Sequence, residues 1–394
     1  MKIRVDSPHG LRRLTAAIEQ NGQSYVVSDS REPAVRFSLW REAQPPRELT
    51  LTIGQKLAPA LKEGKAKLTL YAEANDFRAM DVARQFDVEV VLAPPRVTAD
   101  SMQHYINQGG AELVVFQVAG YWTEAGVKLG PNRFRSFPLP GSKSGERFSL
   151  FVFPWDLPAS AEPLVYASNP GGSEVTAKFW HRVFPKKFRS RELDIGNSFL
   201  EKVVNQIDAG GAGDLLTRFL KINGDLRRAN NRTLADLRLK TEEKVLWRGP
   251  FLQLANSKVE SQFADRRSYV YQGKKVDEQV HLGFDLSVTK NVDVVAANDG
   301  KVVYAGNLGI YGNCVVLDHG YGLQSIYAHL SSAGVKPGDM VKKGGAVGKS
   351  GSTGLAGGDH LHFTMQIDGV QTNPVEWWDD HWIEDRIRSK LPGA

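Results

Sequence analysis

Cysteine and long apolar runs are almost absent from this sequence. Its 394 residues include a single cysteine, Cys314, so neither an intramolecular disulfide nor a cysteine-based zinc finger can form. No run approaches the ~18 apolar residues of a membrane-spanning helix, so we predict no such helix in this sequence. The opening residues, MKIRVDSPHGL, lack the apolar core of a signal peptide. The protein is therefore either cytosolic or separated here from a targeting segment.

The composition that is present is that of an ordinary globular protein. Apolar residues make up 41% and charged residues 24%, which argues against a disordered or fibrous chain. The length predicts two or three domains. The net charge of +6 suits an anionic partner, such as nucleic acid or an acidic cell-wall polymer. Because basic runs interleaved with aromatic residues are missing, we expect no nucleic-acid partner.

The amino-terminal half has the pattern of short strands. Period-two alternation and turn residues predict strands at 35–40, 48–53, 67–71, 86–92, 113–119, 147–153, 164–167 and 175–184. The tripeptide Ala93-Pro94-Pro95 breaks the chain between the two sets. Strands at this spacing without long helices predict antiparallel sandwiches. Because Arg-Phe-Ser-Leu at 36–39 recurs at 147–150, we expect two related immunoglobulin-like domains, at 1–95 and 96–192.

The pattern changes to a helical period in residues 193–245. Ser198-Phe199-Leu200-Glu201 has the form of a capping box that opens a helix, and the glycines of 210–213 end it. Asp214 is expected to cap a second helix, and residues 229–239 are expected to form a third. We predict a short helical connector with no obvious chemistry of its own.

Glycine is concentrated in the last part of the chain, where 17 of the 38 glycines fall within residues 281–374. Glycine supplies the positive φ angles of tight turns, so we predict that residues 246–394 form a compact, barrel-like β domain. The tail at 376–383 holds three tryptophans that we expect to pack back on this domain. The whole chain is therefore predicted to be mainly β.

Four histidines of this domain lie in three short patterns. These are HLGFD with His281 and Asp285, YAHL with Tyr327 and His329, and HLHF with His360 and His362. On a strand, residues two apart share a face, so His360 and His362 can face one pocket, and Tyr327 and His329 share a face of their own strand. Each pattern alone is more typical of structural histidines. Their co-occurrence in one domain favours a metal site.

Imidazole and carboxylate groups suit zinc, and a catalytic zinc site holds three protein ligands and leaves a fourth position open. His281, Asp285 and one of the paired histidines make such a set. Two histidines then remain. They can transfer protons or hold an oxyanion.

The histidine patterns belong to a longer series of motifs. The series comprises residues 259–263, Arg266, 281–285, 296–306, 311–320, 327–330, 335–339, 348–354, 360–363 and 373–374. In this order and spacing, residues 255–378 resemble the lysostaphin/LytM-type zinc metallopeptidases, which cleave peptide cross-bridges of bacterial peptidoglycan. Ala264 departs from the pattern, because the family commonly has glycine there. That departure concerns a turn conformation and not the chemistry.

The resemblance implies a barrel-sandwich (duplicated hybrid motif) fold and one Zn²⁺ ion held by His281, Asp285 and His362. It implies that His329 and His360 are the catalytic pair beside the attacking water. Because the ligand set is complete without His319, that residue is expected to be structural or to lie behind the ligands. Tyr311 and Asn313 either line the substrate groove or form turns.

Other reactive side chains are expected to be unremarkable. Cys314 is predicted to be a small core residue. The histidines outside the patterns are expected to be ordinary, and these are His9, His104, His181 and His381.

The function implied is that of a zinc-dependent endopeptidase hydrolysing peptidoglycan crosslinks, as a D,D-endopeptidase in cell-wall remodelling. The alternative is a non-hydrolytic envelope regulator or peptidoglycan-binding scaffold whose peptidase-like site is occluded by the amino-terminal domains. Expected partners are peptide stems and crosslinks of peptidoglycan, and an envelope protein bound by the amino-terminal domains. We expect a periplasmic or cell-envelope location, with a signal or anchor segment absent from this sequence.

Overall fold

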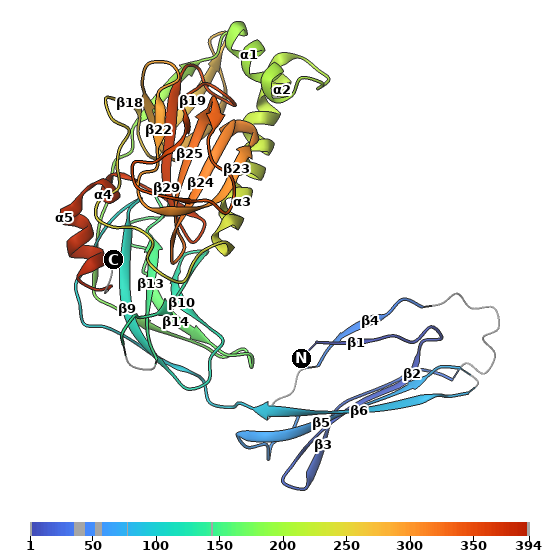
Figure 1. Ribbon diagram of the computed structural model, residues 1–394. Coiled ribbons are helices and arrows are strands. Elements are labelled where there is room, and N and C mark those ends of the chain that lie inside the picture. The colour runs from blue at the N-terminus through green and yellow to red at the C-terminus, as the bar shows by residue number, and fades with distance from the viewer. Residues whose placement is uncertain (1, 35–43, 52–56, 77, 143–144, 392–394) are drawn as a thin grey trace. The chain divides into compact units, whose positions relative to one another are not determined.

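The structure is a computed structural model that describes residues 2–34, 44–51, 57–76, 78–142 and 145–391. The chain divides into two compact units, whose elements are labelled in Figure 1. Unit 1 comprises residues 1–95, 120–123 and 168–174, and unit 2 comprises residues 96–119, 124–167 and 175–394. The first division falls at Pro95, in the predicted chain break. The finer division into four domains stays a prediction.

Unit 1 is built on a four-stranded antiparallel sheet. Its strands in spatial order are β3 (Gln23–Arg31), β2 (Leu11–Gln20), β5 (Gly64–Ala74) and β6 (Asp81–Val90), and β1 (Lys2–Val5) pairs separately with β4 (Arg47–Thr50). Alternate residues of β2, such as Ala16 and Ile18, are buried, as the period of a strand requires.

Three strands expected in unit 1 have counterparts. The strand at 67–71 is confirmed within β5, and the strands at 86–92 and 48–53 are confirmed in part as β6 and β4. The strand expected at 35–40, with the first copy of the Arg-Phe-Ser-Leu repeat, lies outside the described residues.

Residues 96–192 contain two four-stranded sheets. One has the order β11 (Asn132–Arg135), β10 (Glu124–Leu129), β14 (Leu164–Ser168) and β15 (Glu174–Lys178), and the other has the order β12 (Phe137–Pro138), β13 (Glu146–Val152), β9 (Ala111–Ala119) and β7 (Arg96–Ala99). The strands expected at 113–119, 147–153 and 164–167 are confirmed in β9, β13 and β14. The immunoglobulin-like topology stays a prediction.

The single strand expected at 175–184 is wrong. The chain leaves the sheet after β15, at the buried Phe179, and continues as β16 (His181–Phe184), which pairs in parallel with β8 (His104–Asn107). His181 Nδ1 donates a hydrogen bond to the carbonyl of Phe179 (3.0 Å). The alternation of apolar and polar residues over 175–184 therefore does not reveal that the chain passes from one sheet to another.

The connector forms helices α1 (Asn197–Ile207), α2 (Leu215–Lys221) and α3 (Arg227–Asp236). A π-helical turn (Ile222–Leu226) joins α2 to α3, and a 3₁₀ turn (Leu237–Leu239) follows, so the second and third expected helices are one continuous run. The cap of α2 is confirmed, because the Asp214 side chain accepts a hydrogen bond from the Thr217 amide (3.0 Å). The capping box at Ser198 is wrong, because α1 begins one residue earlier and follows Gly196 without a side-chain cap.

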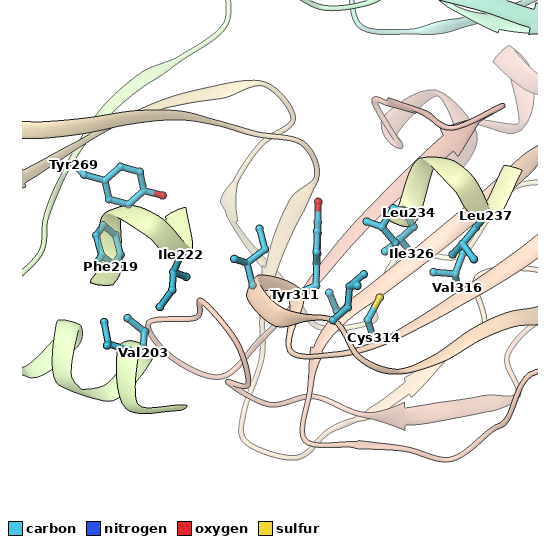
Figure 2. Close-up of a cluster of buried hydrophobic side chains, with 14 of the residues drawn as sticks. Val203, Phe219, Ile222, Leu234, Leu237, Tyr269, Tyr311, Cys314, Val316 and Ile326 are labelled. Atoms are coloured by element: carbon cyan, nitrogen blue, oxygen red, sulfur yellow. The ribbon is translucent and has the colours of Figure 1, made fainter. Parts of the chain in front are cut away.

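The connector helices share a hydrophobic core with the carboxy-terminal region. The buried cluster includes Leu200, Val203, Val204, Phe219, Ile222, Leu234 and Leu237 of the helices, and Ile310, Tyr311, Cys314, Val316, Ile326 and Ala328 of the β region. Figure 2 shows Leu234 and Leu237 lying next to Val316 and Ile326. The connector is therefore a packed layer of the carboxy-terminal region rather than a spacer.

One large sheet organises the carboxy-terminal region. Its order is β18 (Lys258–Ser261), β21 (Phe284–Ser287), β29 (His360–Ile367), β25 (Leu323–Leu330), β24 (Asn313–Gly320), β23 (Gly300–Asn307) and β27 (Met340–Val341), with β30 (Val370–Thr372) paired to β29. Among the described residues no pairing joins β18 to β27, so this sheet is open, and the expected barrel-like form of the domain stays a prediction.

Two three-stranded sheets complete this region. One contains β22 (Asp293–Val295), β28 (Ala346–Lys349) and β26 (Ser332–Ala333), and the other contains β17 (Ser190–Asp194), β19 (Asp265–Tyr271) and β20 (Lys274–His281). A 3₁₀ turn (Gly309–Tyr311) precedes β24. Because β17 pairs in parallel with β19, the chain enters the connector beside β19, and β19 in turn pairs with the β20 strand that ends at His281.

The tryptophan-rich tail packs on the domain, as expected. It forms α4 (Val375–Trp378), α5 (Asp380–Ile383) and a π-helical turn (Glu384–Arg388). Trp377 is fully buried, with its ring centroid 5.8 Å from that of Trp247 and 5.6 Å from that of Phe251. None of the helices in the described residues combines the length and apolarity that crossing a membrane takes.

Candidate metal centre

Three potential metal ligands converge at neighbouring strands. His281 ends β20, Asp285 lies in β21, and His362 lies opposite Asp285 in β29. His281 Nε2 is 2.9 Å from both Asp285 Oδ1 and His362 Nδ1, and the last two atoms are 3.1 Å apart. All three residues are buried. The structure thus brings together the three residues that the resemblance implies as ligands.

Gly283 permits this close approach. Only Leu282 and Gly283 separate His281 from β21, so the chain passes tightly over the imidazole of His362. A Cβ atom on Gly283 would lie 2.6 Å from Cε1 and 2.7 Å from Nε2 of that ring. A larger residue would therefore displace a predicted ligand.

The donor set fits a divalent cation such as zinc. His281 Nδ1 donates to the carbonyl of Gln262 (3.1 Å), so Nε2 is the nitrogen that carries a lone pair into the cluster. Arg267 Nη2 donates to Asp285 Oδ2 (2.6 Å), which leaves Oδ1 facing the histidines. His362 Nε2 is buried and has no hydrogen-bond partner among the described residues. Lone pairs this close repel each other unless a cation or a proton lies between them.

Electrostatics hold the three groups in their metal-binding forms. Burial lowers the pKa of His281 to about 4 and also lowers the pKa of His362. Burial alone raises the pKa of Asp285, but contacts with His281 and other histidines outweigh it and hold this pKa well below its usual range. Neutral imidazoles and an ionised carboxylate are the species that bind metal ions.

His329 and His360 lie beside the three converging residues. Their ring centroids are 4.8 Å apart, and His360 Nε2 is 3.4 Å from Asp285 Oδ1. His329 Nδ1 donates to the carbonyl of Thr353 (2.8 Å), and His360 Nδ1 donates to the carbonyl of Gly358 (2.9 Å). Both rings therefore present Nε2 for chemistry in the pocket.

The expectation that Tyr327 and His329 share a face is wrong. Tyr327 pairs with Phe363, and their ring centroids lie 5.3 Å apart on the face that does not carry His362. His329 has a φ of +61° at the end of β25, which turns its side chain toward His360 and His362. Backbone strain of this kind clusters at functional sites.

A pocket of about 290 Å³ lies beside these side chains, and all five predicted site residues line it. Other parts of its wall come from Phe199, Arg227 and Asn231 of the connector and from Arg267 of β19. The connector therefore contributes to the pocket, although its sequence pattern is only that of amphipathic helices. Alternation along β19 places Arg267 on the same face as Asp265, which pairs with His281. This alternation is the feature from which a place for Arg267 near the site could have been predicted.

Tyr311 and Asn313 have different roles. Tyr311 lines the pocket, and its hydroxyl donates to Asn231 Oδ1 (2.8 Å). Asn313 Nδ2 donates to the carbonyls of Leu330 (3.1 Å) and Ser331 (3.3 Å), so its side chain is used in a turn.

Residues assigned to the core or to turns behave largely as expected. Cys314 is fully buried. His319 is also fully buried, with its nitrogens 2.7 Å from the Asp299 carbonyl and the Ser325 hydroxyl, away from the pocket. Ala264 has a φ of +62°, so it keeps the left-handed conformation that suits glycine. His104 is not ordinary, because it is fully buried, 3.2 Å from Lys390 Nζ.

Residues 279–374 match the sequence model of Peptidase family M23. The chain carries an M23 peptidase domain at its carboxy-terminal end. The metal-ligand cluster and both further histidines lie within the matched residues of this M23 domain.

Three curated relatives are similar to the M23 domain. A protein named "Uncharacterized metalloprotease" from Haemophilus influenzae is 40% identical over 123 residues, which cover 30% of this chain and 25% of that protein. The DD-carboxypeptidase/endopeptidase Mpg of Neisseria meningitidis is 38% identical over 97 residues, which cover 25% of this chain and 22% of that protein. The murein hydrolase activator NlpD of Escherichia coli is 36% identical over 96 residues, which cover 24% of this chain and 25% of that protein. The chain spans about a quarter of the length of these relatives.

Proposed function

We propose that this protein is a zinc-dependent endopeptidase that hydrolyses D-alanyl peptide crosslinks of bacterial peptidoglycan. The observation that carries the proposal is the convergence of His281, Asp285 and His362, with His329 and His360 turned to the same pocket. The printed names of two relatives, a DD-carboxypeptidase/endopeptidase and a murein hydrolase activator, support a substrate in the murein layer. The net charge of +6 suits that anionic polymer.

In this proposal His281, Asp285 and His362 hold the zinc ion. When bound, zinc polarises a carbonyl group and makes water a stronger acid. Arg267 keeps Asp285 Oδ1 turned to the two histidines by holding Oδ2. A neutral His329 or His360 accepts a proton at Nε2 from the attacking water and returns it to the leaving amine. The partner ring, when protonated, donates a hydrogen bond to the oxyanion.

The proposal is tested with purified protein, its zinc content and a muropeptide digest. Wild-type protein should contain about one zinc ion per chain and should convert crosslinked dimers into monomers in mass spectra. His362→Ala should lose zinc and hydrolysis together. His381→Ala is the matched control, because its side chain is 84% exposed and lies outside the pocket, and it should behave as wild type. Zinc-loaded wild-type protein that leaves every crosslink intact would contradict the proposal.

A second candidate function is a non-hydrolytic regulator or peptidoglycan-binding scaffold. The contribution of Phe199, Arg227 and Asn231 to the pocket wall favours it, because connector helices over a groove can occlude it. In that case the zinc-loaded protein would bind peptidoglycan and leave crosslinks intact, while raising the rate of a separate murein hydrolase. The digest therefore separates the two functions.

Location and partners follow from the substrate. A protein that acts on peptidoglycan works in the periplasm or elsewhere in the cell envelope, and we propose this location. The strand-rich residues 1–192 are the proposed surface for an envelope protein. Crosslinking in intact cells, followed by mass spectrometry, tests both points, and capture of cytosolic proteins alone would contradict them.

A further inference from the structure

Arg227 stands in the wall of the peptidase pocket and comes from the connector. It is the first residue of α3, is partly buried, and lines the same pocket as the five predicted site residues. Asn231, one helical turn later, lines the pocket beside it. The Asn231 side chain accepts the hydrogen bond of Tyr311, whose ring centroid is 5.7 Å from that of His362. This face of α3 therefore reaches the metal centre through Tyr311.

The guanidinium of Arg227 is held in place. Its Nε donates to the carbonyl of Asn223 (3.1 Å), and its Nη2 donates to Asn223 Oδ1 (2.6 Å). Asn223 is fully buried, and its Nδ2 donates to Asp277 Oδ2 (2.6 Å), which fixes the amide in turn. The cation is thus positioned before any ligand arrives, which limits the entropy lost on binding.

The described residues provide no carboxylate partner for Arg227. In the part of the chain that the structure describes, no carboxylate forms an ion pair with it, and its Nη1 has no protein acceptor. Arg267, the other arginine of the pocket, is committed to Asp285. Asp194 also lines the pocket, but it is exposed and makes no ion pair with Arg227. A partly buried cation that the described residues leave without a counterion is suited to an anionic ligand.

We infer that Arg227 binds a free carboxylate of the substrate next to the scissile bond. The inference rests on the proposed function and narrows it to one class of crosslink. A D-alanyl–diaminopimelate crosslink bears a free carboxylate on the carbon attached to the nitrogen that hydrolysis releases. A pentaglycine bridge bears none at that place. Arginine suits this role, because its planar guanidinium matches a carboxylate and stays charged at every working pH.

Two synthetic crosslinked dimers test the inference, one with that diaminopimelate carboxylate free and one with it amidated. Wild-type protein should cleave the free dimer with a kcat/KM about tenfold to a hundredfold higher, the range expected for a hydrogen bond to a charged group. Arg227→Gln should lose this preference by slowing the free dimer alone. Arg228→Gln is the matched control, because this neighbouring arginine is exposed and paired with Asp225, and it should keep the preference.

The outcomes are separable. If wild-type protein cleaves both dimers equally, or if Arg227→Gln keeps the preference, the inference is wrong while the proposed function stands. If zinc-loaded wild-type protein cleaves neither dimer, the proposed function fails and the inference fails with it. The wild-type comparison of the two dimers needs no variant, so equal cleavage of both dimers overturns the inference even if Arg227→Gln does not fold.

Discussion

At the scale of single residues, backbone carbonyls set the chemistry of three site histidines. The carbonyls of Gln262, Thr353 and Gly358 accept hydrogen bonds from Nδ1 of His281, His329 and His360, respectively. A carbonyl oxygen only accepts, so each ring keeps its proton on Nδ1 and offers Nε2 to the pocket. The fold therefore fixes three tautomers without using a side chain.

Arg267 has a positioning role that zinc affinity can report. Arg267→Gln removes the hydrogen bond of 2.6 Å to Asp285 Oδ2, so the carboxylate is free to rotate away from His281 and His362. Zinc affinity, measured by competition with a chelator, should fall about 10- to 100-fold. Arg266→Gln is the control, because Arg266 is exposed and outside the pocket. Unchanged affinity in the Arg267 variant would show that this ion pair is only structural.

At the scale of elements, the connector is part of the core of the peptidase domain. Leu234 of α3 is fully buried in the cluster of Figure 2, so Leu234→Ala should lower the free energy of unfolding by about 2–5 kcal/mol. Leu239→Ala, at a residue that is 69% exposed, should change it by less than about 0.5 kcal/mol. Urea unfolding of both variants measures the difference. Equal, small effects would mean that the connector unfolds separately from the domain.

The shared core also changes how an inhibitory role of the amino-terminal half must be tested. A fragment starting near Lys244 removes all three connector helices and uncovers the apolar cluster that they bury. Its loss or gain of activity would then report misfolding rather than relief of inhibition. Point variants in the full chain avoid this difficulty.

Element by element, the sequence predicts local secondary structure well, but it predicts poorly which elements pack against each other. The HxH spacing places His360 and His362 on one side of β29, because strand alternation is a local property, and both line the pocket. His329 reaches the pocket only through a positive φ, which no alternation pattern contains. Arg227 belongs to an amphipathic helix whose neighbours are set by tertiary packing, so its place in the pocket is invisible in the sequence.

At the scale of the whole molecule, the strand-rich residues 96–119 and the tail of the peptidase domain are joined within unit 2 by buried polar contacts. Glu376 is buried and accepts hydrogen bonds from Asn107 Nδ2 (2.8 Å) and the Ala111 amide (2.7 Å). Lys390 Nζ, also buried, lies 2.7 Å from Glu112 Oε1. These contacts make the second strand-rich stretch a structural neighbour of the peptidase domain.

The contact at Glu376 should make the stability of unit 2 depend on pH. Burial raises the pKa of Glu376 to about 7 from 4.5, so the folded state binds its proton more tightly than the unfolded state does. The contribution of Glu376 to stability is then fully present below pH 4.5 and is lost as the pH rises to about 7, by an amount on the order of 3 kcal/mol. Glu376→Gln has no such titration, so urea unfolding from pH 5 to pH 8 should show a smaller fall than in wild type. Parallel curves for the two proteins would contradict this.

The central claim, that the M23 domain hydrolyses D-alanyl crosslinks, is tested most directly by digesting crosslinked muropeptides in H₂¹⁸O. Zinc-loaded wild-type protein should release monomers that carry one ¹⁸O atom in the new carboxylate of D-alanine. The His329→Ala variant should keep its zinc but hydrolyse the crosslink about 10²- to 10⁴-fold more slowly. Intact dimers after digestion with zinc-loaded wild-type protein, or label in any other residue, would contradict the account.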